Sequence, residues 1–190
     1  IRDTDRSRGL GDVYKRQLTG YPTDAEASYA KAIEIAKKSV DTDKFKVYSL
    51  SFMEGEPLSD NLFLISVKLV NKDNQAFSQS YYMTGLEPTA LSDVQRTFEA
   101  PEYETTVGID LTKLDAAQIA AQIAQAKTML PEGHSFKSVG SYQIEEDVPA
   151  GNSVFNRNKT FGKQHTSFVV RFTEDGKETE SLSLIHISEP

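Results

Sequence analysis

Residues 62–83 read LFLISVKLVNKDNQAFSQSYYM, and this stretch decides the fold. In its first part every second side chain is apolar, at Phe63, Ile65, Val67 and Leu69. Alternation with a period of two predicts a strand with one buried face over residues 62–70. The letters NKDN at 71–74 favour a turn. Residues 76–83 are therefore predicted to return as an antiparallel strand, with Tyr82 pointing away from Met83.

Upstream of this hairpin the sequence predicts a helix and one more strand. Thr23 followed by Glu26 has the spacing of a capping box, which marks the start of a helix. Apolar residues then recur every three or four positions, which predicts an amphipathic helix over residues 24–40. Residues 45–52 are rich in β-branched and aromatic side chains and predict a strand.

The same order of elements returns further along the chain. The spacing of Thr112 and Asp115 marks a second helix start, and Pro131 stops that helix after Leu130. Strands are predicted at residues 136–144, at 166–173 and, after the turn EDGK, from 178 onward. We therefore expect an α+β fold of two tandem αβββ units. In each unit one helix would cover a three- to four-stranded antiparallel sheet.

The expected domain organisation follows from these units. The first unit spans residues 18–88, the connection 89–110, and the second unit 111–181. The connection is predicted to hold a helical turn at 92–98 and a short extra strand at 105–109. Units of about seventy residues are near the lower limit for independent folding. We therefore expect the two halves to pack together or to pair edge to edge.

Both ends of the chain resemble translated sequencing adapter. Residues 7–17, SRGLGDVYKRQ, match a transposase-type adapter tail in one reading frame, and residues 182–190, LSLIHISEP, match its reverse complement. We expect residues 1–17 to be adapter-derived and disordered, and residues 182–190 to be adapter-derived. On this hypothesis the chain is a metagenomic fragment whose second unit is truncated, and a signal peptide would lie outside it.

Composition excludes several classes of function. Apolar residues make up 38% of the 190 residues and charged residues 26%, which is typical of a globular protein. No apolar run is long enough for a membrane span. The net charge of -7 disfavours nucleic acid as a partner. The absence of cysteine excludes disulfides, thiolate metal sites and a cysteine nucleophile.

The residues that carry chemistry form no recognisable catalytic or metal-binding pattern. His134 and His165 lack the spacing of metal ligands, and both are predicted to be solvated loop residues. The sequence contains no Gly-x-Ser-x-Gly elbow, phosphate-binding loop or dinucleotide-binding glycine pattern. We therefore predict no catalytic residues, no metal ligands and no cofactor.

The candidate site residues are protein-contact residues. Tyrosines on an open sheet face make good contact surface, and the insertion at residues 148–161 is the least regular loop. The candidates are Tyr48, Tyr81, Tyr82, Asn156 and Arg157. The alternatives are a cross-strand packing cluster for the tyrosines and disorder for the loop.

A helix followed by a three-stranded meander, in tandem, resembles PepSY-like and β-lactamase-inhibitor-like modules, and cystatin-like modules share the order. The resembling stretches are residues 28–40 with 62–82 and 116–130 with 166–180. The resemblance implies an extracytoplasmic, non-catalytic role in which the protein inhibits a peptidase or binds another protein. We expect a non-enzymatic protein-binding or inhibitor-like module of an exported bacterial protein: periplasmic, lipoprotein or secreted. The alternatives are a small cystatin-like enzyme with a pocket between helix and sheet, and a structural domain of a larger envelope protein.

Overall fold

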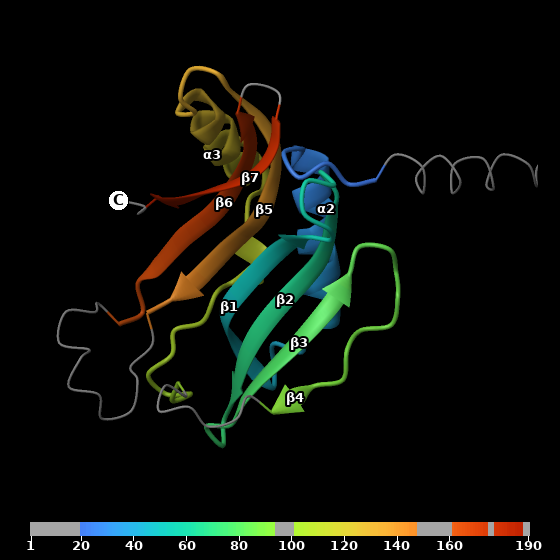
Figure 1. Cartoon of the computed structure of the whole chain (residues 1–190). Helices are drawn as coiled ribbons and strands as arrows, with labels where there is room; N and C mark the ends of the chain where they lie inside the picture. Colours follow the sequence, from blue (N-terminus) through green and yellow to red (C-terminus); the bar gives the residue numbers. More distant parts are fainter. Residues whose placement is uncertain (1–19, 94–100, 148–160, 175–176, 188–190) are drawn as a thin grey trace, which may run out of the picture.

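In the computed structural model, seven strands of the described residues form one antiparallel sheet in the order β4-β3-β2-β1-β5-β6-β7 (Figure 1). The structure describes residues 20–93, 101–147, 161–174 and 177–187, the last range by its backbone path. The elements are α2 (Glu26–Ser39), β1 (Phe45–Glu54), β2 (Leu62–Asn71), β3 (Ala76–Tyr82), β4 (Ser92–Asp93), the 3-10 helix η1 (Leu111–Lys113), α3 (Ala116–Thr128), β5 (His134–Glu146), β6 (Gln164–Glu174) and β7 (Lys177–Ile187). The predicted α+β class is confirmed.

A single sheet forms because β1 pairs with β5. Five residue pairs, from Ser49↔Glu145 to Met53↔Ser141, join the two strands. The strands that were predicted to form a separate sheet in each unit therefore belong to one continuous sheet. The halves meet edge to edge, as expected. This pairing places β1 and β5 in the middle of the sheet.

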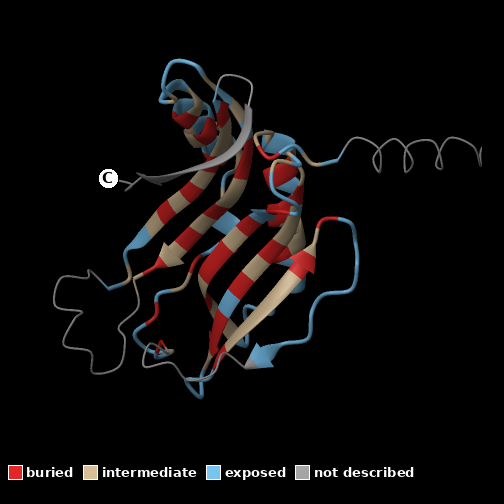
Figure 2. Ribbon diagram, in the orientation of Figure 1, coloured by how far each residue is buried: buried red, intermediate tan, exposed pale blue. Residues whose placement is uncertain are grey.

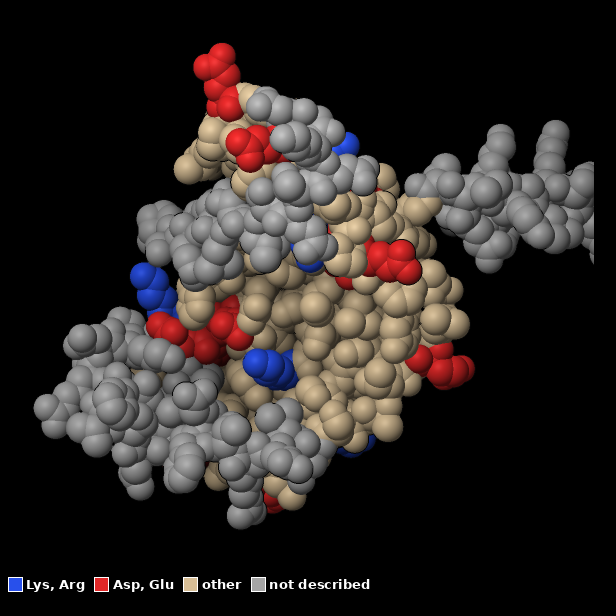
Figure 3. Space-filling model, in the orientation of Figure 1, with Lys and Arg blue, Asp and Glu red and all other residues tan. Residues whose placement is uncertain are grey.

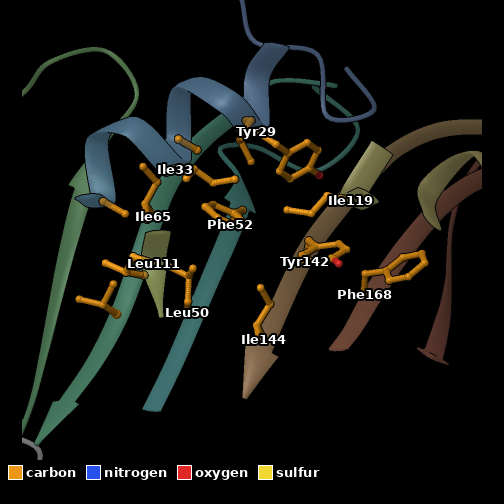
Figure 4. Packing of buried hydrophobic residues seen from close by; sticks show 14 of the residues in the cluster. Tyr29, Ile33, Leu50, Phe52, Ile65, Leu111, Ile119, Tyr142, Ile144 and Phe168 are labelled. Atoms are coloured by element: carbon orange, nitrogen blue, oxygen red, sulfur yellow. The ribbon is translucent and has the colours of Figure 1, made fainter. Parts of the chain in front are cut away.

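One face of the sheet, the inner face, carries the core. A row of large side chains crosses it in register from β3 to β6: Tyr81, Ile65, Phe52, Tyr142 and Phe168. Tyr29 of α2 meets the ring of Phe52 edge-on at 5.6 Å between centroids, and Tyr142 stacks on Phe168 at 5.6 Å (Figure 4). Residues of α2 and α3 belong to the same buried cluster. Both helices therefore cover the same face.

Residues 106–109 form a wedge between β1 and β5, where those strands stop pairing. The wedge bonds to β1 through Ile109, whose backbone N–H donates to the Val47 carbonyl oxygen at 2.7 Å. On the other side Glu146, only 4% exposed, accepts hydrogen bonds from the backbone N–H groups of Val107 and Gly108 at 2.7 and 2.6 Å. The predicted strand at 105–109 is wrong because two of its N–H groups bind a carboxylate rather than a neighbouring strand.

Lys46 anchors the segment that leads into the wedge. Its ammonium donates to the carbonyl oxygens of Tyr103 and Thr106 at 2.8 and 2.7 Å and lies 4.3 Å from the centre of the Tyr103 ring. The predicted helical turn at 92–98 is wrong at its start, where Ser92 and Asp93 pair with β3 as strand β4. Residues 94–98 lie outside the described residues.

The two predicted helix caps differ from those in the structure. Thr23 does not cap α2: its buried hydroxyl donates to Asp60 at 2.6 Å and accepts the backbone N–H of Val139 at 2.8 Å. This residue therefore ties the approach to α2 to β5 in the other half of the chain. At the second helix, Asp115 is the capping residue, since its Oδ1 accepts the Ala117 N–H at 2.9 Å.

An ion pair makes a second connection between the halves. Arg171 Nε lies 3.1 Å from Glu54 Oε2, with the two groups not aligned for a hydrogen bond. The arginine side chain passes over Gly140, where a Cβ atom would lie 2.8 Å from Nε. Any larger residue at position 140 would displace Arg171, so the sequence needs glycine there.

Strand β7 and the histidines depart from the expected boundaries. β7 pairs with β6 from Glu174↔Lys177 to Thr166↔Ile187, so residues 182–187 of the expected adapter segment lie in a strand. Their origin stays a prediction, and residues 1–17 lie outside the described residues. His134 and His165 were predicted in loops but lie in β5 and β6, because both strands begin earlier than their apolar residues indicated.

We predict that Phe52→Ala destabilises the fold by about 3–5 kcal/mol, because the ring is fully buried between the two halves. Met53→Ala is the matched control: this neighbouring side chain points to the other face, is 36% exposed, and should cost less than about 1 kcal/mol. Urea unfolding followed by circular dichroism measures both. Equal losses of unfolding free energy in the two variants would contradict the assignment of Phe52 to the inner face and Met53 to the opposite face.

Candidate functional site

The second face of the sheet, the outer face, is opposite the helices. Three rows of side chains cross it in register from β3 to β6. The central row is Ser80, Ser66, Ser51, Gln143 and Ser167. One flanking row is Tyr82, Leu64, Met53, Ser141 and Val169, and the other is Ser78, Lys68, Ser49, Glu145 and His165. The described elements place no helix over these rows.

The outer face is low in relief and mostly uncharged. All five residues of the central row are half-buried, and four of them are serines with short side chains. Along the strands, half-buried positions alternate with buried ones (Figure 2). In the same orientation, the space-filling view shows a mainly uncharged surface on which basic and acidic groups are both visible (Figure 3). The charged groups of the rows lie together on one flank, where His165 Nε2 is 3.8 Å from Glu145 and Nδ1 is 3.5 Å from Asp147.

The predicted tyrosines separate into different environments. Tyr82 is half-buried on the outer face, away from Met83 as predicted, and lies against Phe63 with 5.4 Å between ring centroids. Tyr81 is 2% exposed on the inner face, where its hydroxyl donates to Gln79 Oε1 at 2.7 Å. Tyr81 is therefore a core residue, and its assignment as a contact residue is wrong. Burial raises the Tyr81 pKa.

Tyr48 lies beside the shift of register in β1, near the charged flank. It is half-buried, and burial, followed by the Glu145 charge, raises the pKa of its phenol to about 12. Asn156 and Arg157 lie outside the described residues. The structure thus leaves Tyr48 and Tyr82, from the predicted set, at the edges of the outer face.

A helix–sheet pocket of about 320 Å³ opens on the other side of the sheet, where α3, the wedge and the inner face meet. Ile119 of α3 and Tyr142 and Ile144 of β5 contribute to its lining (Figure 4). The polar residues of its lining are Asp110, Lys113, Asp115, Gln118, Tyr142, Gln164 and Thr166. Sequence reasoning named none of the residues of this pocket as site residues, because they come from three stretches that lie far apart in the sequence, 107–119, 142–144 and 164–166.

The charged groups of the pocket are mostly engaged with each other. Lys113 Nζ lies 3.3 Å from Asp110 Oδ2, and Asp110 also accepts hydrogen bonds from the side chain and backbone of Thr112. The Thr112 hydrogen bonds lower the Asp110 pKa, with a smaller contribution from Lys113. The described lining holds no serine, cysteine or histidine. Among the described residues, no group of three or more histidine, aspartate or glutamate side chains is placed to hold a metal ion.

No family model, curated protein or solved structure matches this chain. The resemblance to PepSY-like and cystatin-like modules therefore stays a prediction. Within the described ranges no helix is long and apolar enough to cross a membrane.

We predict that stability falls as the pH rises above 10, in part because of Tyr48. Folding raises the Tyr48 pKa from 10.0 to about 12. The contribution of Tyr48 to the free energy of unfolding is therefore fully present below pH 10 and is lost as the pH rises through 12. Tyr48→Phe should reduce this fall, as measured by urea midpoints between pH 9 and about 12. Glu145→Gln should lower the Tyr48 pKa but keep it above 10, because burial is the larger cause. An unchanged pH dependence in Tyr48→Phe would contradict the prediction.

Proposed function

We propose that this chain is a non-enzymatic protein-binding module of an exported bacterial protein, and that it binds its partner through the outer face. The observation that supports this most is the one-sided covering of the sheet. Both helices pack on the inner face, while the described elements leave three registered rows of the outer face without a covering layer. A sheet with an uncovered face is suited to contact with a second protein.

The side chains of the outer face suit such a contact. Serine loses little rotamer freedom when it is buried, so ordering the central row costs little entropy. Leu64, Met53 and Tyr82 supply apolar and aromatic surface on one flank, while Lys68 and Glu145 supply charge on the other. Protein interfaces contain apolar and aromatic contact surface together with polar and charged groups.

The proposal includes the tandem organisation. The order α2-β1-β2-β3 recurs as α3-β5-β6-β7, and the β1–β5 pairing lies between the two sets. This order supports two joined αβββ units and the proposed likeness to PepSY-like or β-lactamase-inhibitor-like modules, which act on other proteins outside the cytoplasm.

The helix–sheet pocket favours the second candidate, a small enzyme of cystatin-like fold, because such an enzyme needs a cavity between helix and sheet. Its lining supports binding more than catalysis. Lys113 and Asp110 form an ion pair, and the Tyr142 hydroxyl donates to Gln122. General acid–base chemistry needs a group that is placed to exchange a proton with substrate, and these groups are already partnered.

Ser66→Arg tests the proposed contact surface, because it places a long charged side chain at the centre of the outer face. Ala30→Arg, on the exposed side of α2, is the matched control. Proteins captured from the encoding organism by each variant are quantified by mass spectrometry. We expect Ser66→Arg to reduce the amount of captured partner at least about tenfold, equivalent to 1.4 kcal/mol of binding free energy. Ala30→Arg should capture as much partner as the parent protein, and both variants should keep the parent melting temperature. Equal retention by the two folded variants would contradict the proposal.

A further inference from the structure

We infer that the helix–sheet pocket binds a cationic group, a guanidinium or primary ammonium on an aliphatic stem. The pocket lies on the helix side of the sheet, so this site is separate from the outer face and goes beyond the proposed function. Its volume of about 320 Å³ is at the small end of ligand sites and suits a group the size of one amino-acid side chain.

The deeper part of the pocket is apolar. Ile119 and Ile144 are buried, Leu114 packs against the same core cluster, and all three line the cavity. An aliphatic stem would gain hydrophobic contact with these side chains, in the way that lysine and arginine stems lie along apolar surfaces.

Thr166 provides a polar group among these apolar side chains. It is 7% exposed, pairs with Ile144 across the inner face, and lines the pocket. Its hydroxyl is part of the pocket lining, where it can accept a hydrogen bond from a ligand.

Two other side chains of the lining, Gln164 and Asp115, offer acceptors. Gln164 uses its side-chain N–H to donate to the Gly108 carbonyl oxygen at 3.2 Å, which leaves its Oε1 as an acceptor. Asp115 uses Oδ1 to cap α3, which leaves Oδ2. With the Thr166 oxygen, the lining presents three acceptors. A guanidinium or ammonium group has only donors and complements this set.

The charge balance favours a cation as well. Lys113 is paired with Asp110, and within the described part of the chain no ion pair balances the charge of Asp115, the other charged side chain of the lining. The N-terminal end of a helix attracts anions, but at α3 the Asp115 carboxylate already occupies that position. The pocket therefore carries a net negative charge toward an incoming ligand. The ligand could come from a free small cation or from an arginine or lysine side chain of a partner, since the recognised chemistry is the same.

Methyl NMR spectra of the intact protein test this site, with Ile119, Ile144 and Thr166 as reporters. The probes are n-butylguanidine and N-acetyl-arginine methylamide, and N-acetyl-citrulline methylamide is the uncharged control of equal shape. We expect saturable shifts of the reporters with a guanidinium probe at millimolar concentration and at least about fivefold weaker binding of the citrulline compound. Binding of n-butylguanidine alone indicates a free small cation, and binding of the arginine compound indicates a partner's side chain. No saturable shift with either guanidinium probe, or equal binding of citrulline, would overturn the inference.

Three substitutions separate recognition from folding. Asp115→Asn keeps an acceptor for the α3 cap and removes the charge, and it should weaken binding about two- to fivefold. Thr166→Val keeps the shape and removes the hydroxyl that lines the pocket, so it should weaken binding while the melting temperature changes little. Asp73→Asn, in the turn between β2 and β3, should change neither the binding of the probes nor the melting temperature. Equal weakening by Asp73→Asn and Asp115→Asn, or a Thr166→Val variant that melts earlier yet binds normally, would overturn the inference. Ser66→Arg should leave the reporter shifts unchanged, so failure of this site is distinguishable from failure of the outer face.

Discussion

The pairing of β1 with β5 is the constraint on which the rest of the structure depends. It joins two sets of strands into one sheet and brings Phe52 of the first half opposite Tyr142 of the second. Side chains alternate between the faces of a strand, so this register determines what each face contains. A slip of one residue would move Ser51 into the core and Phe52 out of it. The uncovered outer face and the helix-covered inner face are therefore both consequences of the same five pairs.

The short pairing of β1 with β5 explains the helix–sheet pocket on the inner face of the sheet. β1 and β5 pair over Ser49–Met53 only, and the wedge at 106–109 bonds to Val47 on one side and to Glu146 on the other. The wedge, the start of α3 and the inner face meet around the helix–sheet pocket. The pocket thus exists where the sheet is incomplete, and its lining combines residues of the wedge and of the start of α3 with residues of β5 and β6. A fully paired β1 and β5 would leave no place for the wedge.

Elements with a local pattern could be predicted from the sequence, and contacts between distant segments could not. The alternation in residues 62–83 predicts β2 and β3 to within one residue at each end, and it also places Tyr81 in phase with the apolar Phe77. The same alternation puts Ser66 and Ser80 on the outer face. The role of Thr23 was missed because its hydroxyl binds Val139, which is 116 residues away. The β1–β5 edge has no local signature, and the proposed cation site depends on residues that only the folded chain brings together.

A cysteine pair across β1 and β5 tests the central claim most directly, because the chain contains no cysteine of its own. Ser51 and Gln143 are directly opposed on the outer face, where facing Cβ atoms lie about 4.5–5.5 Å apart. The account predicts that the double variant Ser51→Cys and Gln143→Cys forms an intramolecular disulfide in the folded protein under mild oxidation. The matched pair Ser51→Cys and Ser141→Cys is displaced along β5 and should form one far more slowly. Equal rates for the two pairs, or no disulfide in the opposed pair, would contradict the joining of the two halves into one sheet.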